Sequence, residues 1–130
     1  IQAARETNLR KTDWVVERAG RAIAELPTDS AVACLGLSYK PDVDDLRESP
    51  ALEVTRRLAE GFPGRIVAVE PHIDGLPNVL GQRGVRLVDL DEALEMAALH
   101  ILLVPHRLFR DRLGTLPVDR RLDLAGLPPG

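Results

Sequence analysis

Residues 31–52 read AVACLGLSYKPDVDDLRESPAL, a stretch that passes from an apolar run into a charged loop and then into a second element. The nearly continuous apolar run over residues 31–37 predicts a strand buried on both faces. We expect a helix over 50–61, because the Ser49 hydroxyl suits a helix cap and Pro50 suits the first helical position. The stretch therefore predicts a strand, a loop and a helix in that order.

The rest of the chain repeats this alternation of short apolar runs and helical stretches. The expected later strands are 66–70, 85–88, 101–104 and, more weakly, 120–123. The expected later helices are about 90–98 and about 106–113. Alternating strands and helices predict an α/β fold, an open parallel sheet of about five strands with helices on both faces, similar to a Rossmann fold.

A separate helix is expected before the sheet. Apolar residues recur at spacings of three and four over residues 13–26, from Trp14 to Leu26, which predicts an amphipathic helix. The run Pro27–Ser30 should end it, because proline lacks a donor and short polar residues favour a turn. We therefore divide the chain into a linker helix, residues 1–27, and a ligand-binding domain, residues 28–130.

Composition limits the possible partners. The net charge of −3, with both signs interspersed, gives no broad positive field, so neither nucleic acid nor an anionic membrane is an expected partner. Apolar runs are far shorter than the roughly 20 residues that span a bilayer. One cysteine, Cys34, cannot form an internal disulfide, and the chain opens on no apolar leader, so we expect a soluble cytoplasmic protein.

The charged loop offers an anion-binding site. Ligands of open parallel sheets lie at the carboxyl ends of the strands, and Lys40 and Arg47 both lie between such an end and the start of the next helix. Free N–H groups at that helix start also favour negative charge, so a pyrophosphate fits there. The alternative is a solvated loop held by salt bridges. The same edge holds Ser38, Tyr39, Pro71, His72, Pro105 and His106.

Other tempting residues favour structural roles. Cys34 lies within an apolar strand, where a buried inert thiol is expected. No Gly-x-Gly-x-x-Gly follows a predicted strand, so the dinucleotide fingerprint is missing, and Gly36 and Gly61 suit a strand-end turn and a helix C-cap. The three histidines share no metal-ligand spacing, so no metal site is expected. Among them, His100 suits the sheet and His106 is the candidate for ligand contact.

The loop closely resembles the signature that opens the C-terminal domain of the UDP-glucose/GDP-mannose dehydrogenase family, strand-Gly-x-x-aromatic-Lys followed by Asp-x-Asp-Asp-x-Arg-Glu-Ser-Pro. The matching residues are Gly36, Tyr39, Lys40, Asp42, Asp44, Asp45, Arg47, Glu48, Ser49, Pro50 and Leu52. Weaker resemblances are Ala4-Arg5-Glu6-Thr7-Asn8 in the linker helix, Val69-Glu70-Pro71 and His106-Arg107-Leu108-Phe109 after strands, and Asp123 at the end of a late strand.

The resemblance implies the UDP-sugar-binding part of an enzyme that oxidises a sugar C6 alcohol to a carboxylate with NAD, through a cysteine thiohemiacetal. It implies substrate contacts at Tyr39, Lys40 and Arg5, and an approach of Arg47 to the NAD phosphates. Arg5 and Asn8 resemble the branch acting on UDP-N-acetylhexosamines such as UDP-N-acetylmannosamine. The nucleophile and the NAD-binding domain would lie outside this chain, which would be inactive alone. Such enzymes form homodimers through the linker helix.

The sequence departs from the family at Leu9, Thr12 and Ala125, where relatives carry Asp, Pro and, in some, Arg. The exact UDP-sugar therefore stays open. A receiver-like signalling domain is a weak rival, because no lysine follows Lys40. The second rival is a free-standing sugar-nucleotide-binding or assembly module without catalytic partner domains, and the upstream sequence would separate it from the enzyme.

Overall fold

The computed structural model describes residues 2–38, 40–42, 46 and 49–125, with side chains in the first helix from Lys11 onward. It contains a five-stranded sheet in the order β3-β2-β1-β4-β5, in which every pair is parallel. The strands are β1 (Val32–Leu35), β2 (Ile66–Val69), β3 (Arg86–Leu87), β4 (Leu99–Leu102) and β5 (Arg121–Asp123). The predicted open parallel α/β sheet is confirmed.

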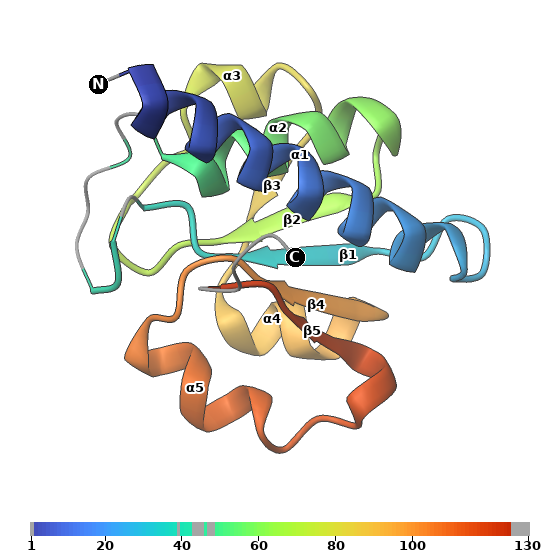
Figure 1. Ribbon diagram of the computed structural model, residues 1–130. Coiled ribbons are helices and arrows are strands. Elements are labelled where there is room, and N and C mark those ends of the chain that lie inside the picture. The colour runs from blue at the N-terminus through green and yellow to red at the C-terminus, as the bar shows by residue number, and fades with distance from the viewer. Residues whose placement is uncertain (1, 39, 43–45, 47–48, 126–130) are drawn as a thin grey trace.

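Helices cover both faces of this sheet, as expected (Figure 1). The helices are α1 (Gln2–Ala24), α2 (Pro50–Gly61), α3 (Asn78–Gly81), α4 (Leu90–Met96), α5 (Arg107–Leu113) and the 3-10 helix η1 (Val118–Arg120). Helices α1, α2 and α3 lie on one face, and α4 and α5 lie on the other. Among the described residues, no helix is both long enough and apolar enough to span a bilayer.

The two faces follow from the alternation of side chains along each strand. Val32 and Cys34 of β1 point into the core under α1 and α2, and Ala33 and Leu35 point into the core over α4 and α5. Cys34 is fully buried, and that burial raises the pKa of its thiol to about 12 despite a hydrogen bond with Thr55. The predicted burial of Cys34 is confirmed, and the raised pKa disfavours the thiolate that reactivity requires.

His100 is a buried polar residue in β4. Its Nε2 lies 2.9 Å from the carbonyl oxygen of Ala93, and its Nδ1 lies 3.1 Å from that of Arg120. The ring thus joins α4 to η1 beneath the sheet, and the predicted place of His100 within the sheet is confirmed.

Several boundaries differ from the sequence predictions. Helix α1 begins at Gln2, well before residue 13, because no glycine or proline interrupts the chain before Gly20. Helix α3 was not predicted, since four residues are too few to show a helical period. Strand β4 begins two residues before the predicted 101. Gly61 is the last residue of α2 rather than its C-cap, which is Phe62.

Gly36 directly follows β1, at a point where two backbones nearly touch. Its φ is +101°, and a Cβ placed there would lie 2.6 Å from Val104 Cβ and 2.9 Å from Val104 N. The Leu35 carbonyl oxygen accepts hydrogen bonds from the N–H groups of Leu103 and Val104 in the same crossing. Gly36 therefore sets how closely the chains leaving β1 and β4 approach one another, and its predicted place at the strand end is confirmed, although no turn forms at that residue.

Substitution of Gly36 by alanine should destabilise the chain by roughly 2–4 kcal/mol, since it adds both a strained backbone and a steric overlap in the core. Urea unfolding followed by Trp14 fluorescence measures the change. Gly64→Ala is the matched control, because Gly64 also has a positive φ of +76° but nothing lies within 4 Å of its Cβ position. Equal losses for the two variants would contradict a role for the Val104 contact.

Candidate functional site

The carboxyl edge of the sheet brings together segments that follow β1, β2 and β4. Ser38 follows β1, Glu70 follows β2 and His106 follows β4, and all three side chains are buried. Ser38 and His106 were expected at this edge, and they lie within hydrogen-bond distance there. The strand order turns around between β1 and β4, which is where open parallel sheets form their ligand crevice.

Glu70 is the centre of this group. Its Oε1 accepts hydrogen bonds from the N–H groups of Leu37 at 2.9 Å and Ser38 at 3.2 Å, and its Oε2 accepts one from His72 N at 3.0 Å. His106 Nε2 lies 2.9 Å from Oε1 and adds a fourth bond. A buried carboxylate is stable only when its lone pairs are matched in this way.

These bonds decide the ionisation of Glu70. Burial by itself raises the pKa of the carboxyl group, but hydrogen bonds from His106 and from the N–H groups of Leu37 and His72 stabilise the anion. The net effect is a pKa below its ordinary value of 4.5. The folded chain therefore holds a negative charge directly beneath the loop that follows β1.

His106 joins Glu70 to the far end of that loop. Its Nδ1 accepts a hydrogen bond from the backbone N–H of Asp42 at 2.7 Å, so the network assigns the ring proton to Nε2, which donates to Glu70. Asp42 has a φ of +60°, and its Oδ1 accepts from Arg107 N at the start of α5. The imidazole thus links β2, α5 and the loop.

Two serines complete the support of the loop. Ser38 Oγ donates to the carbonyl oxygen of Lys40 at 2.7 Å. Ser49 caps α2 as predicted, because its Oγ accepts from Leu52 N at 3.3 Å, and Pro50 takes the first helical position. The same Ser49 hydroxyl donates to the Ser38 carbonyl oxygen at 3.2 Å. The loop is thereby tied to the N-terminus of α2.

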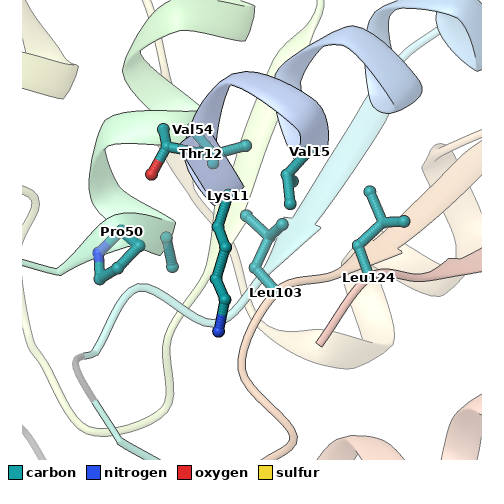
Figure 2. Close-up of a pocket in the computed structure, with 8 residues that line it drawn as sticks. Lys11, Thr12, Val15, Pro50, Val54, Leu103 and Leu124 are labelled. Atoms are coloured by element: carbon teal, nitrogen blue, oxygen red, sulfur yellow. The ribbon is translucent and has the colours of Figure 1, made fainter. Parts of the chain in front are cut away.

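A pocket of about 190 Å³ opens beside this loop, between α1, the start of α2 and the residues that follow β4 and β5. Figure 2 shows Lys11 extending from α1 between Pro50 and Leu103, with Val15 and Leu124 on the side of Leu103. The remaining lining residues are Thr12, Ala51 and Val54. The pocket therefore combines an apolar wall, an ammonium group and a helix N-terminus, which favours an anion attached to an apolar group.

The predicted site residues are only partly placed. Lys40 is exposed at this edge, and among the described residues no carboxylate pairs with it. Tyr39, Arg47 and the side chain of Arg5 lie outside the described residues, so their assignments stay predictions. Sequence reasoning missed Lys11. Its position one helical turn beyond Asn8 was the available signal, since residues three apart share a helix face.

The histidines come closer together than their spacing indicated. Donor atoms of Asp42, His72 and His106 lie within 4.8 Å of one another, a grouping that could hold a metal ion. The two ring nitrogens of His106 already bond to Asp42 N and to Glu70, so a metal on Nδ1 would displace the Asp42 N–H group. Within the described chain this grouping acts as a hydrogen-bond network, and the expected lack of a metal site stays a prediction.

The low pKa of Glu70 predicts a pH-dependent stability. A carboxyl group whose pKa is depressed on folding stabilises the fold above its ordinary value of 4.5 and loses that contribution as the pH falls towards the folded-state pKa. The unfolding free energy of the chain should therefore fall between about pH 5 and pH 3 more steeply than that of Glu70→Gln. Urea titrations across this range measure the difference.

Glu53→Gln is the control for this experiment. The pKa of Glu53 is also lowered, chiefly by a hydrogen bond with Arg56, but its side chain is 40% exposed and solvent screens the pair. Its pH curve should follow that of the unaltered chain closely. Parallel curves for the unaltered chain and Glu70→Gln would show that Glu70 titrates alike in the folded and unfolded states.

Similarity to known proteins adds to this geometry. UDP-N-acetyl-D-mannosamine dehydrogenase of Campylobacter jejuni is 43% identical over 110 residues, which cover 84% of this chain and 27% of that protein. NDP-N-acetyl-D-galactosaminuronic acid dehydrogenase of Ralstonia solanacearum is 42% identical over 110 residues, covering 85% of this chain and 25% of that protein. The chain spans about a quarter of the length of these relatives.

Solved structures agree with this similarity. A UDP-N-acetyl-mannosamine dehydrogenase from Staphylococcus aureus aligns with a TM-score of 0.59 and 32% identity, covering 76% of this chain and 22% of that one. A GDP-mannose dehydrogenase from Pseudomonas aeruginosa aligns with a TM-score of 0.70, covering 97% and 30%, and at 24% identity it supports the fold alone.

The pattern of the UDP-glucose/GDP-mannose dehydrogenase family, UDP binding domain, matches residues 33–120. This range extends from β1 through η1 and contains the loop, Glu70 and His106. The expected resemblance is confirmed, and the chain belongs to the UDP-glucose/GDP-mannose dehydrogenase family, as its UDP binding domain.

Proposed function

We propose that this chain binds the nucleotide of a UDP-N-acetylhexosamine, most specifically UDP-N-acetylmannosamine, as the C-terminal domain of an NAD-dependent 6-dehydrogenase. The observation that carries the proposal is the pocket at the sheet edge, where Lys11 and the N-terminus of α2 lie beside the loop that bears Lys40. The name of one relative, UDP-N-acetyl-D-mannosamine dehydrogenase, supports the choice of substrate.

The chemistry of the pocket suits a nucleoside diphosphate. The ammonium groups of Lys11 and Lys40 and the dipole of α2 attract the pyrophosphate, and charge-assisted hydrogen bonds are about twice as strong as neutral ones. Val15, Leu103 and Leu124 offer an apolar surface to the uridine. Arg5 and Tyr39 are proposed as further substrate contacts, and Arg47 as a contact to the NAD phosphates.

The size of the pocket favours a shared site. About 190 Å³ is below the roughly 300–1,000 Å³ of complete small-molecule pockets, so this chain would enclose only part of a sugar nucleotide. The rest of the ligand would lie against domains that this chain does not contain. The same division assigns NAD mainly to an N-terminal domain, with the linker helix, residues 1–27, joining the two parts.

The proposed oxidation needs a cysteine nucleophile, and Cys34 does not suit the role because it is buried and its pKa is raised to about 12. We propose that the nucleophile lies in another domain and that the isolated chain is inactive.

A free-standing binding module is the less favoured alternative, since the relatives of this chain are dehydrogenases. A cytoplasmic location and a homodimer through α1 are further parts of the proposal. Among the described side chains, the exposed large apolar ones are Leu108 and Val118, neither of them on α1.

The proposal predicts that the chain binds UDP and that each lysine contributes. Lys40→Ala and Lys11→Ala should each weaken binding about threefold to tenfold, the effect of one charge-assisted contact in a partly exposed site. Added salt should weaken binding by the unaltered chain more than by the double variant. Isothermal titration calorimetry, with UDP titrated into the chain, measures both effects.

Arg21→Ala is the matched control, because Arg21 is exposed on the same helix as Lys11 but is absent from the pocket lining. Its UDP affinity should equal that of the unaltered chain. If Arg21→Ala lost as much UDP affinity as the lysine variants, the lysine effects would reflect only the net charge of the chain. Failure of the unaltered chain to bind UDP would contradict the proposal.

A further inference from the structure

The loop after β1 is held from below by a buried acid and a buried imidazole, neither of which lines the pocket. We propose that Glu70 and His106 are positioning residues, which fix the backbone around Lys40 and so place its ammonium group against the phosphates of UDP. This inference rests on the proposed function, because it concerns the same ligand.

The anchoring points surround Lys40 on both sides. Glu70 holds the N–H groups of Leu37 and Ser38 ahead of it, and His106 holds the N–H group of Asp42 after it. The carbonyl oxygen of Lys40 itself accepts from Ser38 Oγ, which also lies 3.3 Å from His106 Nε2. The backbone of Lys40 is therefore restrained before, at and after the residue.

The network also fixes the loop relative to the other proposed phosphate contacts. The Ser38 carbonyl oxygen accepts from the hydroxyl of Ser49, and Ser49 caps the helix whose N-terminus borders the pocket. A displacement of Ser38 would thus alter the distance between Lys40 and the N-terminus of α2. Binding by two groups at once requires that their separation match the ligand, because a misplaced contact is lost rather than weakened gradually.

A purely structural role explains the network less well. Buried ionic groups at a sheet end can often be replaced by packed apolar side chains without loss of stability. Apolar side chains, however, cannot accept the backbone N–H groups of Leu37, Ser38 and Asp42, the last of which has a φ of +60°. The network therefore serves the conformation of the loop.

The two ring nitrogens of His106 have different partners, which allows a matched pair of variants. The side chain of His106→Asn places an amide oxygen near the former Nδ1, where it can accept from Asp42 N, whereas His106→Gln places its amide near Nε2 and loses that acceptor. His106→Gln should weaken UDP binding about threefold to tenfold, the effect of one hydrogen bond, and His106→Asn should bind UDP more tightly than His106→Gln.

A double-mutant cycle with Lys40→Ala separates positioning from general damage. If His106 acts through Lys40, His106→Gln should change the UDP affinity less than about twofold once Lys40 is alanine, because coupled residues are not additive. Val67→Ala is the stability control, since Val67 is buried in β2 but has no part in the network. All titrations are made at a temperature at which unfolding curves show every variant to be folded.

The outcomes are distinct. An equal effect of His106→Gln with and without Lys40, or a similar loss of UDP affinity in Val67→Ala, overturns the positioning role and leaves the proposed function in place. Equal UDP affinity of His106→Gln and the unaltered chain also overturns the positioning role and leaves the proposed function in place. Failure of the unaltered chain to bind UDP overturns both the positioning role and the proposed function.

Discussion

The carboxylate of Glu70 accepts hydrogen bonds from three backbone N–H groups and one imidazole, and the arrangement of the sheet edge depends on it. An unmatched charge in this position would be costly, so the segments that carry the donors must reach Glu70 at the correct depth. The chain leaving β1, the turn after β2 and the start of α5 are therefore fixed relative to one another. Their common restraint is electrostatic rather than steric.

A steric restraint operates at Gly36, one residue before Leu37. Gly36 lets the chain after β1 pass against Val104, so that the Leu35 carbonyl oxygen can accept from both Leu103 and Val104. The loop consequently leaves the sheet beside the residues that follow β4 and carry His106. Two restraints therefore act on consecutive residues. The close contact at Gly36 fixes the direction in which the loop leaves the sheet, and the hydrogen bonds to Glu70 fix the position of Leu37 and Ser38 relative to the strand ends.

This arrangement separates the proposed phosphate contacts from the residues that support them. Lys11 and Lys40 present charge at the surface, and the apolar pocket wall comes from α1, α2 and the segments after β4 and β5. Glu70, His106 and Ser38 lie beneath them and are buried. Under the proposed function, such a domain would hold one side of a nucleotide while other domains supply the reacting groups. The small volume of the pocket agrees with such a division of roles.

The sequence by itself determined the alternation of strands and helices, the cap at Ser49 and the burial of Cys34. Each of these is written in local spacing or in one contiguous motif, because strand and helix periods and caps involve residues only a few positions apart. Tertiary structure alone decided that Glu70 would serve Leu37, that His106 would accept from Asp42, and that Lys11 would border the pocket. Those pairs are separated by more than 30 residues or lie on different elements, and no local pattern encodes which strand ends become neighbours. The order of strands in the sheet made them neighbours, and the need to match every buried polar group then determined their bonds.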